Sequence, residues 1–123
     1  MADLTVTIAD IELAADWLDD NPETREAIDE ALPVEGDAAR WGDELYFEIP
    51  VDVPEEHGQV EVPMGAIAYW PQGNALCVFW GPTPASVDDT PRAASAVNVV
   101  AQLEDPTAID IGSGGAHVRV DRA

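Results

Sequence analysis

The sequence has 123 residues, which is enough for one domain with a substantial core but not for two. It contains 25 Asp and Glu but only five Arg and no Lys, so its net charge is −20. Such a charge argues against direct binding to nucleic acid or to a membrane surface. The hydrophobic content of 46%, which includes four Trp, argues against a disordered chain.

The N-terminal part of the chain predicts a hairpin followed by one helix. Residues 4–8 alternate in polarity and are β-branched, and residues 11–13 follow after a short turn, which is typical of two paired strands. Asn21 is the expected N-cap and Pro22 the first helical residue. Apolar residues then recur at helical spacing until Pro33 ends the helix.

The rest of the sequence predicts mainly β-structure. A tight hairpin is expected at residues 71–74, a long loop at 81–91, a short helical turn at 106–109 and a flexible turn at 112–115. Because closure of a sheet removes its exposed edges, we expect an all-β fold with one or two short helices and a closed barrel of about eight strands. The further strands are predicted at residues 44–49, 65–70, 75–80, 95–103 and 116–120.

Acidic residues are dispersed from Asp3 to Asp121 rather than gathered into a tail. This composition is similar to that of proteins from extreme halophiles, whose solvated carboxylates keep them soluble in concentrated KCl. An acidic mimic of nucleic acid is the alternative, and it would need denser rows of carboxylates. The single cysteine, Cys77, cannot form an intramolecular disulfide, and no signal-peptide pattern or apolar run of ~20 residues is present, so we expect a cytoplasmic protein.

Three ordered motifs carry a resemblance to a known family. They are WGDELYF at residues 41–47 followed by Pro50 and Val51, YWPQGNALCVFWGPTP at 69–84, and ASAVNV at 94–99. The chain resembles the small stand-alone prokaryotic cyclophilin-like domains, which are atypical relatives of the peptidyl-prolyl isomerases. The resemblance runs from about Thr5 to Val120, so we expect residues 1–123 to form a single cyclophilin-like domain. It implies a cyclophilin-type barrel beside a groove, which holds an X-Pro peptide in true cyclophilins.

In true cyclophilins an Arg beside an apolar pocket donates a hydrogen bond to the prolyl nitrogen. The Phe-His-Arg and Gly-Gly-Asp-Phe segments of those enzymes are absent from this sequence. Arg92 is the candidate for substrate anchoring and for any catalysis, and the alternative is that it pairs with Asp88 or Asp89. Arg40 is a weaker candidate that could stack on Trp41 or pair with Asp43.

The aromatic residues of the motifs indicate where a groove would lie. Successive residues of a strand face opposite sides, so one member of each pair Tyr69–Trp70 and Phe79–Trp80 is expected to point outward. An outward Trp lines a pocket or an interface. A buried Asn98 must find hydrogen-bond partners, either structural or on a ligand. The predicted ligand-binding residues are Trp41, Tyr46, Tyr69, Trp70, Trp80, Arg92 and Asn98.

No metal site or cofactor is predicted. The spacing of His57, His117 and Cys77 matches no zinc pattern, and Cys77 is expected to be a buried, inert thiol. Residues 41–44 are interpreted as a turn in which Gly42 has a positive φ, with an acid–base pair of Asp43 and Glu44 as the alternative.

The sequence therefore predicts a binding domain whose groove accepts a peptide segment or a small apolar ligand, with little or no prolyl isomerase activity. An active prolyl isomerase and a structural or regulatory subunit of a complex are the alternatives. A monomer or a weak homo-oligomer is expected.

Overall fold

A computed structural model describes residues 2–123 as a closed ring of strands. Neighbouring strands in the ring are antiparallel and follow the order β2-β1-β9-β3-β4-β7-β6-β8, and β8 pairs again with β2. This confirms the all-β class and the closed arrangement of eight strands. The ring strands are β1 (Leu4–Ile8), β2 (Ile11–Trp17), β3 (Val34–Arg40), β4 (Glu44–Glu48), β6 (Ala66–Trp70), β7 (Ala75–Phe79), β8 (Arg92–Leu103) and β9 (Ala116–Arg122).

Two strands were not predicted from the sequence. Strand β3 contains Gly36 and Asp37, residues of low β-propensity, and it is held in place by pairing with β9 on one side and β4 on the other. The three-residue strand β5 (Gln59–Glu61) lies outside the ring and pairs only with the first part of β8. Strands β2 and β8 are also longer than expected.

The main core fills the ring because alternate residues of each strand point inward. On β6 the inward residues are Ile67 and Tyr69, and on β7 they are Leu76 and Val78, all at most 1% exposed. Strand β4 contributes Leu45 and Phe47 in the same way. The outward residues of these three strands therefore form a second surface, on the other side of the sheet.

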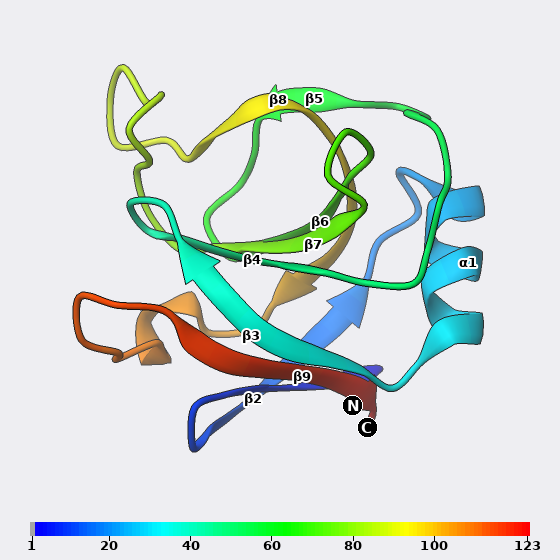
Figure 1. The fold of residues 1–123 in the computed structure, drawn as a ribbon, viewed down its shortest axis with the longest axis horizontal. Coiled ribbons are helices and arrows are strands. Elements are labelled where there is room, and N and C mark those ends of the chain that lie inside the picture. Colours follow the sequence, from blue (N-terminus) through cyan, green and yellow to red (C-terminus); the bar gives the residue numbers. More distant parts are fainter. Residues whose placement is uncertain (1) are drawn as a thin grey trace.

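A second, smaller core covers that outer surface. Residues 98–102 of β8 pair with β6, whereas residues 92–97 continue beyond the sheet and pair with β5 (Figure 1). The first half of β8 and β5 thus form a flap over the outer face of β6 and β7. The side chains buried beneath this flap are Val62, Ala66, Ala68, Cys77, Phe79, Ala93, Val97 and Val99.

The helix α1 (Pro22–Ala31) begins where the sequence predicts, but its N-terminus is capped by a different residue. The Asn21 side chain makes no capping bond; its amide donates to Val99 O at 2.8 Å and accepts from the His57 backbone N–H at 2.7 Å. The Glu56 carboxylate instead accepts from the backbone N–H groups of Glu23 and Thr24 at 3.2 and 3.1 Å. The Glu56 carboxylate therefore replaces the expected Asn21 cap. A short 3-10 turn, η1 (Pro106–Ala108), precedes β9.

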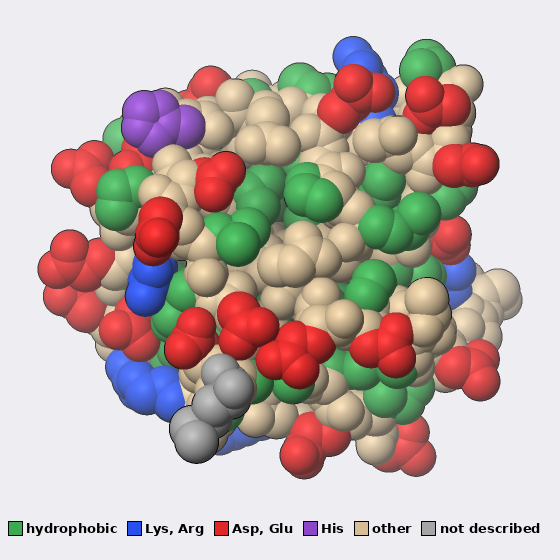
Figure 2. All heavy atoms as spheres, turned by 180° about the vertical axis from the view of Figure 1, so that it is seen from behind, with side chains coloured by type: hydrophobic (Ala, Val, Ile, Leu, Met, Phe, Trp, Pro, Cys, Tyr) green, Lys and Arg blue, Asp and Glu red, His purple; other side chains and the backbone are tan. Residues whose placement is uncertain are grey.

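The surface carries acidic side chains between apolar ones. Figure 2 shows carboxylates spread over one face of the molecule, with few basic side chains among them. Among the described residues, the large apolar side chains that are exposed are Met64 and Val87. No helix formed by residues 2–123 is long and apolar enough to cross a membrane.

Candidate functional site

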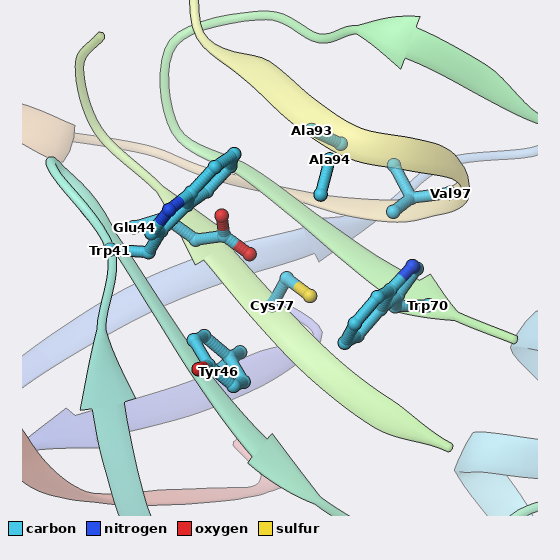
Figure 3. A pocket seen from close by; sticks show the side chains of 8 residues that line it. All are labelled: Trp41, Glu44, Tyr46, Trp70, Cys77, Ala93, Ala94 and Val97. Atoms are coloured by element: carbon cyan, nitrogen blue, oxygen red, sulfur yellow. The ribbon is translucent and has the colours of Figure 1, made fainter. Parts of the chain in front are cut away.

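A pocket of about 250 Å³ lies on the outer face of the ring, beneath the first half of β8. Figure 3 shows three aromatic side chains and the carboxyl group of Glu44 around this space. The remaining wall is formed by small or apolar side chains and one thiol. The lining residues are Trp41, Glu44, Tyr46, Trp70, Cys77, Ala93, Ala94 and Val97.

A tight turn before β4 positions Trp41 and Glu44 at one side of the pocket. The Trp41 backbone N–H donates to Glu44 O at 2.9 Å, and Gly42 has φ of +62°, as predicted. A Cβ at position 42 would lie 2.8 Å from the Cα of Thr83, so both the backbone conformation and the space require glycine. Asp43 also fixes this turn, because its backbone N–H donates to Pro82 O at 3.0 Å.

Tyr46 and Trp70 form two walls that meet almost at a right angle. Their ring centroids are 6.3 Å apart and the interplanar angle is 80°, an edge-to-face arrangement. The indole N–H of Trp70 donates to Ser95 Oγ at 2.6 Å, which ties this wall to the flap. The two aromatic walls are therefore fixed by packing and by a hydrogen bond before any ligand arrives.

Glu44 places a carboxyl group in this apolar setting. It is only 5% exposed, and burial raises its pKa to about 7, although a hydrogen bond from the Cys77 thiol opposes the increase. Burial, and then the neighbouring Glu44, raise the pKa of the Cys77 thiol well above its usual range. The thiol is thus unreactive, whereas Glu44 changes its charge close to neutral pH.

Three of the predicted site residues, Trp41, Tyr46 and Trp70, come together at this pocket. Tyr69 does not, because it is fully buried inside the ring, where its hydroxyl donates to Val51 O at 2.6 Å. Strand alternation correctly places Tyr69 and Trp70 on opposite faces, and Trp70 is the outward member.

Asn98 is also fully buried and is used within the fold. Its side-chain amide donates to Thr24 Oγ1 at 3.0 Å and to Pro54 O at 3.1 Å, and it accepts from the Glu56 backbone N–H at 2.9 Å. These bonds join β8 to α1 and to the segment before β5. The Asn98 side chain therefore forms its hydrogen bonds within the fold and not with a ligand.

Trp80 and Arg92 are not among the lining residues. The guanidinium of Arg40 lies 5.3 Å from the centroid of the Trp80 ring and pairs with Asp43 at 3.1 Å, so its aromatic partner is Trp80 and not Trp41. Arg92 approaches Glu61 at 4.0 Å instead of Asp88 or Asp89.

The other three arginines pair with carboxylates elsewhere. Arg25 pairs with Asp19, Arg122 with Asp29, and Arg119 with Glu35 and Asp121. None of the five arginines, all of which lie in the described chain, lines the pocket.

Neither Glu44 nor Cys77 was among the predicted ligand-binding residues. Glu44 was considered only as an acid–base partner of Asp43, but Asp43 pairs with Arg40 and does not line the pocket. Glu44 and Tyr46 are two residues apart on β4 and therefore face the same side of the sheet, a signal that could have identified Glu44 from the sequence. The contribution of Ala93, Ala94 and Val97 depends on the bend of β8 over the sheet, and no local pattern indicates that bend. Within residues 2–123, no group of three or more His, Cys, Asp or Glu side chains could hold a metal ion.

Comparison with known proteins agrees with this architecture. The family model described as cyclophilin-like matches residues 2–121. The chain is 37% identical to a hypothetical protein from Archaeoglobus fulgidus, whose solution structure superposes with a TM-score of 0.79 over 99% of this chain and 95% of that one. No curated protein matches the chain. Given the family match over nearly the whole sequence, the chain belongs to the cyclophilin-like family.

Proposed function

We propose that the protein is a binding domain whose pocket on the outer face of β4, β7 and β6 accepts a small, largely apolar group. That group is either a free molecule or a side chain of a peptide. The observation that carries the proposal is a preformed hollow of about 250 Å³ between Trp41, Tyr46 and Trp70. Binding sites for small molecules are commonly hollows of this kind, apolar with a few polar groups that fix orientation.

We propose little or no prolyl isomerase activity for this pocket. An isomerase of the cyclophilin type needs an Arg that donates to the prolyl nitrogen from beside the proline pocket. Here the polar group beside the aromatic walls is the Glu44 carboxyl, and Arg92 is directed to Glu61. Glu44 has a donor only in its neutral form, whereas the guanidinium that a cyclophilin-type isomerase uses is a donor at every relevant pH and is not among the lining residues.

We further propose that the domain, residues 1–123, works in the cytoplasm of a cell with high internal salt, as a monomer or a weak homo-oligomer. The net charge of −20 without any Lys supports the salt adaptation. Trp70 and Trp80 are half-buried within the chain, Trp70 under the flap and Trp80 beneath Arg40. Neither tryptophan therefore needs a partner protein to cover it, which favours a ligand site over a subunit interface.

The four tryptophans provide a direct test by NMR. Trp41 and Trp70 line the pocket, whereas Trp17 and Trp80 do not, so their indole N–H signals serve as reporters and internal controls in one spectrum. In molar KCl, N-acetyl-Ala-Pro-methylamide and cyclohexanol are titrated separately, and exchange spectra of the peptide report any faster cis/trans interconversion. Uncatalysed exchange takes tens to hundreds of seconds, so even weak catalysis is detected.

The proposal predicts saturable shifts of the Trp41 and Trp70 signals with at least one probe and no faster exchange of the peptide. Ala94→Trp fills the pocket from β8 and should abolish the shifts, whereas Ala94→Ser should keep them. Shifts confined to Trp17 and Trp80 would contradict the assignment of the pocket. Accelerated exchange that is lost on Arg92→Ala would establish the isomerase alternative instead.

A further inference from the structure

The pocket contains a buried acid without a cationic partner. Glu44 is 5% exposed, and its side-chain hydrogen-bond partner is the neutral thiol of Cys77. None of the eight lining residues is basic. Arg40, the basic residue closest in sequence, is engaged with Asp43 and with the Gly42 carbonyl oxygen, to which its Nε donates at 2.7 Å. Protonation relieves the cost of burying Glu44 when the pocket is empty, whereas an ionised Glu44 needs a positive charge that none of the lining residues supplies.

The aromatic side chains show the same pattern. Trp17 and Trp80 each have an Arg guanidinium 5.3 Å from the ring centroid, supplied by Arg25 and Arg40. The two tryptophans of the pocket have no such partner among the described residues. The two tryptophans outside the pocket thus each contact an Arg side chain, whereas Trp41 and Trp70, which line the pocket, contact no cation within the described residues. Aromatic faces attract cations through the ring quadrupole, most strongly where water is excluded.

The shape of the pocket selects among cations. Its volume of about 250 Å³ is many times the share of about 30 Å³ that one water molecule takes in the liquid, so a bare metal ion would leave it largely empty. Tyr46 and Trp70 meet almost at a right angle, and Figure 3 shows the Glu44 carboxyl directed into the space between Trp41 and Cys77. Such walls surround a bulky cation with apolar substituents, while the carboxylate faces its charge.

From these features we infer that the pocket recognises an organic ammonium group, with Trp41, Tyr46 and Trp70 against its alkyl substituents and Glu44 as the counter-ion. This inference rests on the proposed function, because it names the ligand class of the same pocket. The ammonium group could belong to a free quaternary amine or to an alkylated lysine of a peptide.

Choline and its uncharged isostere 3,3-dimethylbutan-1-ol test the inference, because they share a shape and differ in charge. Each is titrated into the protein in molar KCl while the indole signals of Trp41 and Trp70 are followed. We expect choline to bind at least about tenfold more tightly than the isostere. N-acetyl-trimethyllysine-methylamide is titrated as a third ligand. If it binds more tightly than choline, the ammonium group belongs to an alkylated lysine of a peptide; if the two bind equally, the pocket recognises the ammonium group alone.

Variants separate the charge from the apolar contact. Glu44→Gln should weaken choline binding about tenfold or more and leave the isostere unchanged, because only the counter-ion is lost. Glu48→Gln, an exposed position on the same strand, is the matched control and should change neither. Trp41→Leu should weaken choline binding several-fold because it removes an aromatic contact and keeps the Glu44 carboxyl group.

The outcomes distinguish this inference from the proposed function. If the isostere binds as tightly as choline, the ammonium inference is overturned while the apolar binding site stands. If cyclohexanol shifts the Trp41 and Trp70 signals but choline does not, the ammonium inference is likewise overturned and the apolar binding site stands. If no probe of either set shifts these two signals, both proposals are refuted.

Discussion

Replacement of Glu44 by Gln should change the pH dependence of stability in a calculable way. In the folded protein, burial raises the pKa of this carboxyl from 4.5 to about 7, so the folded state holds its proton where the unfolded state has lost it. The ionised form therefore favours unfolding. Stability contributed by the neutral acid is complete below pH 4.5, falls as the pH rises, and levels off above about pH 7. Glutamine has nearly the same shape and cannot ionise, so the variant escapes this loss.

The size of the effect follows from the shift. Each unit of pKa is worth about 1.4 kcal/mol, so the displacement from 4.5 to about 7 amounts to about 3 kcal/mol when the ionisation is complete. Part of this difference is already present at pH 5. Between pH 5 and pH 8, the free energy of unfolding of Glu44→Gln should therefore rise relative to that of the wild type by about 2.5 kcal/mol.

Urea denaturation in molar KCl at several pH values between these limits measures the difference directly. All other titrations occur in both proteins and cancel in the comparison, provided that the m-value is unchanged. Glu48→Gln removes one negative charge from the exposed face of the same strand, and its stability relative to the wild type should vary by less than about 0.5 kcal/mol. If Glu44→Gln also runs parallel to the wild type over the whole range, burial does not hold this carboxyl neutral and the electrostatic description of the pocket is wrong.

Further predictions concern the fold around the pocket. Asn98→Ala should lower the free energy of unfolding by about 3 kcal/mol, measured in urea, because it leaves buried partners unpaired; a loss below 1 kcal/mol would contradict the structural interpretation. Glu56→Ala should lower the free energy of unfolding, measured in urea, through loss of the helix cap, whereas Glu55→Ala should change it very little, and equal effects would refute the cap. Hydrogen bonds with Asp37 and then Glu35 raise the pKa of His117, so its NMR titration midpoint should lie above 6.5. The stability from these contacts is complete below pH 6.5 and is lost as the pH rises through the raised pKa; a midpoint at or below 6.5 would refute them. Removal of KCl should lower the Tm because unscreened carboxylates repel one another, and an unchanged Tm in dilute buffer would contradict the salt adaptation.

Local patterns in the sequence predict much of this fold. The apolar runs at residues 66–70 and 75–79, with their β-branched and aromatic side chains, identify two ring strands, and the alternating direction of side chains along a strand places Tyr69 and Trp70 on opposite faces. The turn at Gly42 follows from residue types in the same way. These features depend on backbone preferences within a few residues, which a single sequence contains.

Features that depend on distant contacts were not predictable. Strand β3 forms because β9 and β4 offer it hydrogen bonds on both sides, despite Gly36 and Asp37. Alternation separates Tyr69 from Trp70 but does not say which of them faces the interior, and so Tyr69 was expected in the groove. The capping of α1 by Glu56 joins positions about 30 residues apart, for which the sequence around Asn21 gives no signal.

Intermolecular NOEs from a bound probe test the central claim most directly, namely that the pocket on the outer face of the ring is the ligand site. The methyl protons of choline, or the ring protons of cyclohexanol if only the neutral probe binds, are observed at a saturating concentration. Contacts with the aromatic protons of Trp41, Tyr46 and Trp70, and none with Trp17 or Trp80, are the predicted result. NOEs to other parts of the chain, with none to these three rings, would show that the protein binds its ligands elsewhere.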